Sequence, residues 1–428
     1  MPCYEDYWTT DGLFQIGGFR DIMPRDRFFS IMQFFHLSDN DIAIPRGQPG
    51  HDRLAKIRPF TEILIPAWQD AYYPGQNLSV DESIVAFKGR CGFVVYKPNK
   101  PHKWGLNAWV CANSTNGYVY NWELYCGKSE EPTGRHGLTH NVVTHLLLPI
   151  YNQGHIVYMD NYFPSPALFD ELAENQTGAC GTLRVNRCGV PELIKRTKTE
   201  KCGDLVSAQD GKKLFLSWHD KRQVNLISTV HSATTFVKEV RCKDPDNGNI
   251  RRIVKPMAVE LCTQHMGGVD RLDRQVWCHL EQHRTMKWWK KLFVYLLEVT
   301  VCQAKVVWEE AHGKDARRLA TNLRKNIIHG LIDGYTRSSS RRAGRPSALV
   351  EKPFRLTERH FPSYNPKKNA NGKNIQLDCV VCSDRSVKRH TTEFVCTECD
   401  VPLHPSPCFM RYHTLVNYKT PCVPGLHK

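Results

Sequence analysis

The chain has 428 residues, of which 41% are hydrophobic and 24% are charged, and this is enough for two or three folded domains. Its 58 Lys and Arg residues and 43 Asp and Glu residues give a net charge of +15, which favours nucleic acid as the partner. No run of 18 apolar residues occurs, and the start MPCYEDYWTTDG is acidic and aromatic. These features exclude a membrane-spanning protein and predict no secretory signal.

The first 186 residues contain two kinds of pattern. Residues 1–76 carry apolar residues at helical spacing, as in PRDRFFSIMQFFHLSD, and are predicted to form a helical domain. Residues 77–186 begin with four β-like runs, the first of which is LSVDESIVAF. A helix, a strand, a second helix and a last strand are predicted to follow. This alternation predicts a mixed α/β core.

The rest of the chain divides into four parts. Residues 187–256 are basic and polar with short strand patterns, and are predicted to form a β-rich domain inserted into the core. Residues 257–334 are predicted to be helical and to complete the core. Residues 335–375 are poor in large apolar residues and rich in Arg, Lys, Ser, Pro and Asn, which is typical of a flexible linker. Residues 376–428 are predicted to form a compact cysteine-rich domain.

Three aspartates stand on separate elements of the predicted core. Asp81 lies in the first strand, Asp160 ends the strand IVYMD, and Asp270 follows a Gly-Gly pair at the start of a helix. A few carboxylates together with phosphate oxygens suffice to hold Mg²⁺. Two such ions, roughly 3.5–4 Å apart, can activate an attacking hydroxyl and stabilise a leaving oxygen in phosphoryl transfer. Taken singly, however, each aspartate is more often a turn former or a helix cap, so the pattern alone leaves both interpretations open.

Several longer motifs occur in one order along the chain: DESIVAFKGR, KPNKPHKWGLNAW, YMDNYF, CGTLRVNR, and MGGVDRLDR followed by RTMKWWKKLF. Through these motifs, from about Trp8 to His413, the chain resembles the piggyBac-type transposases and their domesticated relatives. The resemblance implies a ribonuclease-H-like catalytic core with an inserted β-rich domain, a helical N-terminal domain and a C-terminal zinc domain. It also implies metal-dependent cut-and-paste transposition, in which element ends are nicked and inserted at TTAA targets.

The resemblance further implies which residues act. The metal-binding triad falls on Asp81, Asp160 and Asp270 and would hold two Mg²⁺ ions. Asp273 matches a further acid of the family, one helical turn after Asp270. Glu82 alternates to the other face of its strand and is not expected to bind metal. The expected partners are a second copy of the chain and double-stranded DNA with terminal inverted repeats.

The chain departs from the family pattern in two places. ELCTQH precedes MGGVD where the family usually carries a Tyr-Asn pair, and Arg274 stands where a Gln is expected. The region before Tyr7 and Trp8 is also shorter than in the family, so we expect the dimerisation and DNA-binding domain in residues 1–76 to be truncated. The short N-terminus favours an alternative function, a domesticated DNA-binding protein without transposition activity. A zinc-dependent interaction module on an inert scaffold ranks last, because it leaves the basic charge without a role.

Seven candidate zinc ligands lie near the C-terminus. They are Cys379, Cys382, Cys396, Cys399, His404, Cys408 and His413. Two Cys-x2-Cys pairs can complete one tetrahedral zinc site. Alternatively, seven candidates indicate an interleaved two-zinc domain of the RING or PHD kind, with His390, Cys422 or His427 as the eighth ligand. The family ends in such a domain, which recognises transposon ends, so a ubiquitin-ligase module is the less favoured interpretation.

A basic segment, RSSSRRAGRPSA, precedes the zinc domain. Its Arg341, Arg342 and Arg345 lie around a Gly-Arg-Pro sequence, which can enter a narrow A·T minor groove. A solvated linker or a nuclear-import tract explains the same residues. The basic charge, together with cysteines that are mostly scattered or in zinc spacing, favours a reducing compartment, and we expect the nucleus.

Overall fold

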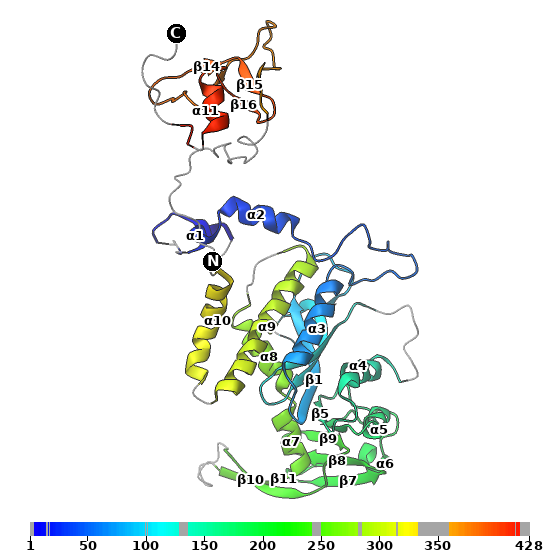
Figure 1. Cartoon of the computed structure of the whole chain (residues 1–428). Coiled ribbons are helices and arrows are strands. Elements are labelled where there is room, and N and C mark those ends of the chain that lie inside the picture. The colour runs from blue at the N-terminus through cyan, green and yellow to red at the C-terminus, as the bar shows by residue number, and fades with distance from the viewer. Residues whose placement is uncertain are drawn as a thin grey trace. The chain divides into compact units, whose positions relative to one another are not determined.

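The computed structural model describes residues 4–13, 16, 18–98, 100, 102–127, 136–241, 250–280, 285–313, 316–332, 359–415 and 417–419. The chain divides into two compact units, Met1–Arg337 and Ser338–Lys428 (Figure 1). Within the described ranges, no helix is both long enough and apolar enough to cross a membrane.

The larger unit contains both helices and strands. Its helices are η1 (Tyr4–Trp8), α1 (Phe19–Ile22), α2 (Arg25–Phe34), α3 (Arg58–Ala71), α4 (Leu138–Leu147), η2 (Leu148–Ile150), α5 (Pro166–Glu174), α6 (Glu192–Arg196), α7 (Met257–His265), α8 (Gly268–Trp277), α9 (Trp288–His312) and α10 (Ala316–Ile332). Its strands are β1 (Asn77–Ala86), β2 (Val94–Tyr96), β3 (Trp104–Asn113), β4 (Val119–Leu124), β5 (Ile156–Met159), β6 (Gly178–Thr182), β7 (Leu205–Asp210), β8 (Lys213–His219), β9 (Gln223–Ser228), β10 (Thr235–Arg241) and β11 (Ile250–Pro256).

A mixed sheet forms the centre of the larger unit. Among the described residues it has nine strands in the order β2-β3-β1-β5-β6-β9-β8-β7, with β4 also paired to β3. Strands β1, β5 and β6 are parallel, whereas β3 runs antiparallel to β1 and β9 antiparallel to β6. The carboxyl ends of β1, β5 and β6 therefore lie at one edge of the sheet, where α/β proteins commonly bind ligands.

Helices cover both faces of this sheet, so the core has two parts. On one face, Trp68 of α3, Leu272 of α8 and Leu292 of α9 belong to a single buried cluster with apolar residues of β1, β3 and β4. On the other face, Val143 of α4 and Leu168 of α5 belong to a second cluster with alternate residues of the same strands. Burial of both faces confirms the mixed α/β core predicted for residues 77–186.

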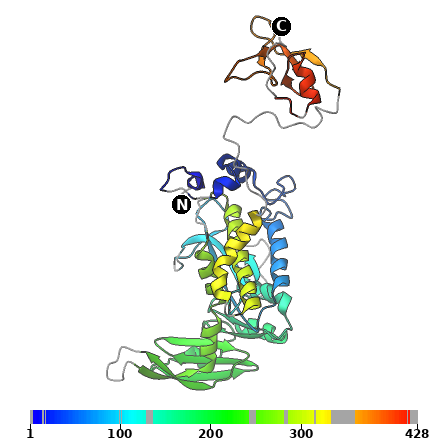
Figure 2. The same ribbon diagram turned by 60° about the vertical axis from the view of Figure 1, so that its left-hand side comes forward.

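The region predicted as an inserted β-rich domain, residues 187–256, is attached to the core sheet through β7, β8 and β9. Strand β9 pairs antiparallel with β6 through Cys180 and Ser228, and β8 and β7 continue the sheet beyond it. Strand β6 would otherwise leave its backbone groups unpaired at an edge, and this pairing satisfies them. Strands β10 and β11 form a ribbon of their own beside β7–β9 (Figure 2).

The N-terminal helices bury less than their sequence predicts. Apolar spacing in 25–35 predicts a helix with a buried face, but α2 contains no buried residue, and Phe34 is exposed. Its Phe28 instead contacts Trp8 of η1, with ring centroids 5.1 Å apart. Phe35, just after α2, is the residue that reaches the core, where it lies 4.9 Å from the ring of Phe293 on α9.

The smaller unit is built from short elements. These are β12 (Pro362–Tyr364), β13 (Leu377–Asp378), β14 (Thr391–Thr392), β15 (Phe394–Cys396), β16 (Val401–Pro402) and α11 (Cys408–Thr414). Strand β15 pairs with β12 and β16. The buried cluster of this unit contains four cysteines, which indicates a domain that depends on metal rather than on a large apolar core.

Candidate metal sites

Strand register places two of the predicted aspartates side by side. The parallel pairing of β1 with β5 ends at Val80 opposite Met159, and Asp81 and Asp160 are the next residues on the two strands. Val80 and Met159 are both buried in the cluster under α4 and α5. Because side chains alternate along a strand, Asp81 points to the opposite face, on which α8 lies. Glu82 points to the same face as Val80.

Helix α8, which carries Asp270 and Asp273, packs closely along β1. A Cβ atom on Gly268 would lie 2.3 Å from the Ser79 hydroxyl and 2.8 Å from the Asn113 carbonyl oxygen, so only glycine allows this approach. Four residues further along β1, the Ser83 hydroxyl donates to the Asp273 carboxylate at 2.6 Å. Ser79, Asp81 and Ser83 share one face of β1, so α8 is fixed on both sides of Asp81.

The turn between β3 and β4 also packs against α8. A Cβ atom on Gly117, whose φ is +79°, would lie 3.1 Å from the backbone of Gly268 and of Leu272. The Arg271 guanidinium donates to the Thr115 carbonyl oxygen at 2.6 Å. The neighbouring Asp270 is exposed, while Asp273 lies deeper in the structure.

The carboxylates lie where burial opposes a negative charge. Burial raises the pKa of Asp81 to about 7, and the charge of Asp160 acts in the same direction. Burial likewise raises the pKa of Asp160, and it raises the pKa of Asp273 to about 6. The Lys100 ammonium lowers all three pKa values. Desolvated carboxylates near one another are stabilised by a cation, and these hard oxygens suit a divalent ion such as Mg²⁺.

The three predicted ligands do not meet at one point. In the part of the chain that the structure describes, groups of three or more ligand atoms that all lie within 4.8 Å of one another occur only in the smaller unit. Asp81 and Asp160 are neighbours on adjacent strands, whereas Asp270 is exposed on α8. The structure therefore brings together two of the three predicted ligands, Asp81 and Asp160.

In the smaller unit, eight side chains form two groups of four. The first group is His360, Cys396, Cys399 and His413, and the second is Cys379, Cys382, His404 and Cys408. The two Cys-x2-Cys pairs therefore lie in different groups, and the groups alternate along the chain. This is the interleaved two-site arrangement and not the single four-cysteine site.

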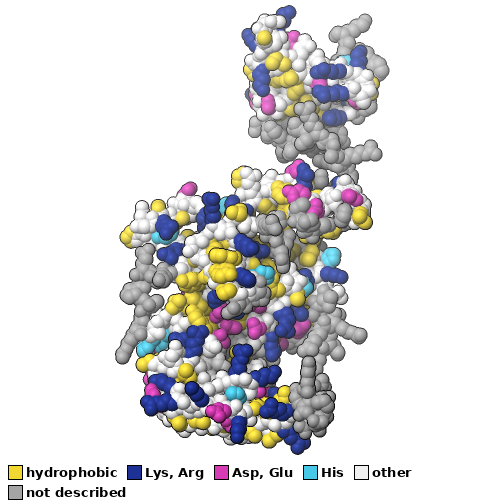
Figure 3. Space-filling model, turned by 180° about the vertical axis from the view of Figure 1, so that it is seen from behind, with side chains coloured by type: hydrophobic (Ala, Val, Ile, Leu, Met, Phe, Trp, Pro, Cys, Tyr) yellow, Lys and Arg dark blue, Asp and Glu magenta, His cyan; other side chains and the backbone are white. Residues whose placement is uncertain are grey.

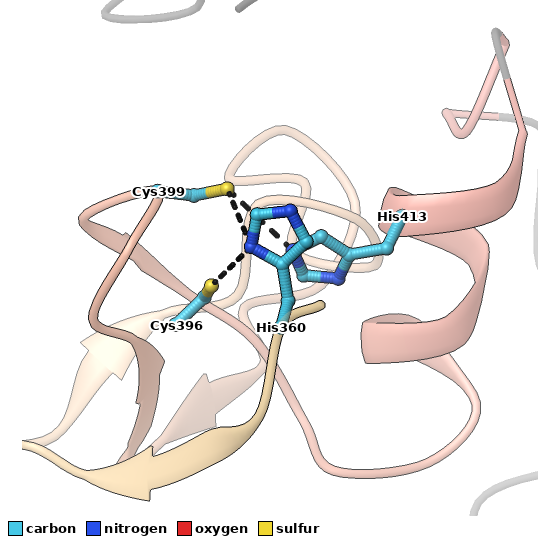
Figure 4. Close-up of side chains that lie close together, drawn as sticks. All are labelled: His360, Cys396, Cys399 and His413. Atoms are coloured by element: carbon cyan, nitrogen blue, oxygen red, sulfur yellow. Dashed lines mark hydrogen bonds between the residues drawn. The ribbon is translucent and has the colours of Figure 1, made fainter. Parts of the chain in front are cut away.

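Hydrogen bonds orient the histidines toward the cysteines. In the first group, His413 Nε2 lies 3.6 Å from Cys399 Sγ, and His360 Nδ1 lies 3.5 Å from Cys396 Sγ (Figure 4). The other ring nitrogen of His413, Nδ1, lies 2.8 Å from the Phe409 carbonyl oxygen. A carbonyl only accepts, so Nδ1 carries the proton and Nε2 presents a lone pair to the cysteines, as metal-binding histidines do.

The second group repeats this design. His404 Nδ1 lies 3.3 Å from Cys382 Sγ, and its Nε2 lies 3.1 Å from the Thr391 carbonyl oxygen. Burial raises the pKa of the Cys396 thiol to about 12 in the first group, so a thiolate there needs a cation beside it. The first group offers two thiolates and two imidazoles, and the second offers three thiolates and one imidazole; both donor sets fit Zn²⁺.

The eighth ligand position corrects the prediction from sequence. His360 completes the first group, whereas His390 belongs to neither group among the described residues, and Cys422 and His427 lie outside those residues. Pairing of β12 with β15 brings His360 to Cys396, so the part of the expected linker from 359 onward belongs to the zinc domain. In the sequence, the only sign of His360 as a ligand is its position ahead of the first Cys-x2-Cys pair. Arg341, Arg342 and Arg345 lie outside the described residues.

Comparisons with known proteins agree with this architecture. A family model described as Transposase IS4 matches residues 1–304, and a model described as a DDE_Tnp_1-like zinc finger matches residues 363–414. PiggyBac transposable element-derived protein 3 of Homo sapiens is 26% identical over 405 residues, which are 92% of this chain and 63% of that protein. PiggyBac transposable element-derived protein 2 of Homo sapiens is 24% identical over 296 residues, which are 66% of this chain and 48% of that protein. The chain thus spans less than two thirds of the length of these relatives.

A solved structure shows the same fold. The structure of a piggyBac transposase synaptic complex with hairpin DNA matches with a TM-score of 0.62 at 22% sequence identity, over 93% of this chain and 83% of that one. This match confirms the ribonuclease-H-like core, and the matching zinc-finger model confirms the C-terminal zinc domain. Since the transposase model covers well over half of the sequence, the chain belongs to the piggyBac-type transposase family.

Proposed function

We propose that this chain is a metal-dependent DNA transposase that cleaves DNA strands at terminal inverted repeats and transfers them to TTAA targets. The observation that carries the proposal is the register of β1 and β5, which sets Asp81 beside Asp160 where the parallel pairing of the two strands ends. Three contacts fix α8, the helix that carries Asp270, against β1 and the β3–β4 turn. In the proposal the site combines carboxylates from three separate elements.

In this proposal Asp81, Asp160 and Asp270 hold two divalent ions, with Mg²⁺ as the expected metal. Bound there, the ions would supply an activated hydroxyl and would neutralise charge on the leaving oxygen. The chain itself orients the ligands. The Glu82 amide donates to Asp81 at 2.7 Å, and the Tyr162 amide donates to Asp160 at 2.9 Å, so one oxygen of each carboxylate is fixed.

The other parts of the protein have matching roles in the proposal. The two Cys/His groups each hold one zinc ion, and the folded zinc domain binds transposon ends. Two copies of the chain act together on double-stranded DNA in the nucleus. Asp273 fixes the helix of Asp270 through Ser83, and Ser83 also lies 3.1 Å from the Tyr295 hydroxyl of α9.

The test is Mg²⁺-dependent nicking of a linear duplex that carries the repeats flanking the gene and TTAA. Asp160→Ala is the test variant, and Asp220→Ala, at an exposed position of the β8–β9 turn, is the matched control. Nicking by the wild type and the control, and none by Asp160→Ala, supports the proposal. Binding without nicking by the wild type contradicts it and favours the alternative, a domesticated DNA-binding protein.

A further inference from the structure

Three segments of the larger unit meet beside Asp160. The loop after β5 carries Asn161 and Tyr162, the loop after β6 carries Arg184, and Lys97 follows β2 directly. We call Lys97, Asn161, Tyr162 and Arg184 the Tyr162 cluster. The Lys97 ammonium lies 5.9 Å from the centroid of the Tyr162 ring, and the Arg184 guanidinium carbon lies 6.0 Å from it. Two cations therefore flank one aromatic ring within cation–π distance.

Each cation is held in place by a single side chain. Lys97 Nζ donates to Glu82 Oε1 at 2.6 Å, and the Lys97 side chain remains 30% exposed. Arg184 donates from Nε and Nη2 to Asn161 Oδ1, at 3.3 and 3.1 Å. An ammonium has three donors and a guanidinium has five, so both groups can donate further to a ligand.

The charge of Arg184 is not neutralised by its partner. Arg184 is exposed, and its hydrogen-bond acceptor, the Asn161 amide oxygen, carries no charge. In the described ranges Arg184 forms no ion pair within 4.0 Å. A guanidinium fixed in this way suits the two oxygens of a phosphate group. On one face of the larger unit, Lys and Arg side chains surround a group of acidic side chains (Figure 3). Cations beside the carboxylates would offset the repulsion between those carboxylates and an approaching polyanion.

Arg187, three residues after Arg184, has a different task. Its Nη2 donates to the Tyr162 carbonyl oxygen at 2.6 Å, and its Nε is buried. Arg187 therefore stabilises the loop after Asp160 from the buried side of that loop. Because the loop has this support, Arg184 and the exposed part of Lys97 are not required to keep it in place.

We propose that Lys97 and Arg184 form a binding site for the phosphodiester backbone of the DNA strand next to Asp160. The inference rests on the proposed function, since it takes DNA as the substrate. It adds a specific pair of residues that contact phosphates independently of base sequence. The bound group is one phosphate, or two consecutive phosphates, of the strand that is to be cut.

The salt dependence of DNA binding tests the proposal. The full chain is titrated, in Ca²⁺ and without Mg²⁺, against a fluorescein-labelled linear duplex with one TTAA step, and anisotropy gives the binding constant at several salt concentrations. Each phosphate contact contributes about 0.9 to the slope of log K against log salt. Lys97→Gln and Arg184→Gln should therefore each reduce the slope by about 0.9, and the double variant should reduce it by about 1.8.

Three control variants separate phosphate binding from a structural role. Asn161→Ala releases Arg184 but removes no charge, and it should leave the slope unchanged. Lys97→Arg and Arg184→Lys keep the charge and should also keep the slope. Lys97→Gln leaves the half-buried Glu82 carboxylate without its lysine partner. If Lys97→Gln unfolds, the exposed Arg184→Gln carries the test by itself.

The outcome separates this inference from the proposed function. An unchanged slope for Arg184→Gln, in a protein that melts like the wild type, overturns the phosphate site even if the wild type nicks DNA. A reduced slope in a chain that never nicks DNA supports the phosphate site and contradicts only the transposase proposal. An equal loss of slope in Asn161→Ala shows that geometry and not charge is involved, and also overturns the inference.

Discussion

Gly268 is the position where one added methyl group should do most damage to the proposed active site. In Gly268→Ala the new Cβ would lie 2.3 Å from the Ser79 hydroxyl, 2.8 Å from the Asn113 carbonyl oxygen and 3.1 Å from the Ser114 Cα. Normal contacts of this kind are about 3.5 Å or longer. The serine hydroxyl can rotate away, but the two backbone atoms cannot, so α8 must move away from the end of β3.

The expected change in stability is the difference between two terms. Overpacking of a close contact costs roughly 1–3 kcal/mol. Alanine is a better helix former than glycine by about 1 kcal/mol, which offsets part of that cost. The free energy of unfolding of the larger unit should therefore fall by roughly 0–2 kcal/mol. Because a 1 Å misplacement can cost about 100-fold in rate, nicking should fall more than stability suggests.

Urea unfolding followed by circular dichroism measures the first quantity, and the nicking assay measures the second. Gly267→Ala is the matched control, since a Cβ at Gly267 meets nothing within 4 Å. It changes only a helix cap and should cost under about 1 kcal/mol. If Gly268→Ala proved as stable and as active as Gly267→Ala, the close packing of α8 on β1 would not be what positions Asp270.

Three further predictions concern the zinc domain and two ion pairs. His360→Ala should reduce the bound zinc, measured by mass spectrometry of the native protein, from two ions to one, whereas His390→Ala should retain two. Equal zinc content in both variants would refute the ligand assignment. Arg324 makes a bidentate ion pair with Glu298, whose side chain is 10% exposed. Arg324→Met should therefore lower the free energy of unfolding by roughly 3 kcal/mol, because it leaves the Glu298 charge unpaired. An unchanged urea midpoint would contradict this. Hydrogen bonds from Lys238 of β10 and Lys255 of β11 lower the pKa of Glu260 in the folded protein. The ionised Glu260 therefore stabilises the fold above the usual carboxyl pKa of about 4.3, and this stabilisation is lost as the pH falls through the lower pKa of the folded state. Glu260→Gln should accordingly unfold earlier than the wild type at neutral pH and equally with it in acid, and a difference that persists in acid would refute the ion-pair explanation.

Much of the architecture followed from the sequence by itself. The alternation of apolar residues around Asp81 predicted a strand with one face on each side of the sheet, and the two clusters that share β1 agree with it. The change from β-like to helical patterns predicted the mixed core. The cysteine spacing predicted a zinc domain, because two cysteines with two residues between them can bind the same ion. These signals are local, and local patterns can be read along the chain.

What only the tertiary structure decided depends on contacts between distant segments. The pairing of β6 with β9 extends the core sheet into residues 187–256, where the sequence predicted an inserted β-rich domain but not its attachment to the sheet. His360 reaches Cys396 only because β12 pairs with β15, across a segment whose composition is that of a linker. The position of Asp160 beside Asp81 depends on strand register, and a shift of one residue would turn either side chain to the other face. Register, edge pairing and the completion of a ligand set are properties of the folded chain, and no local pattern contains them.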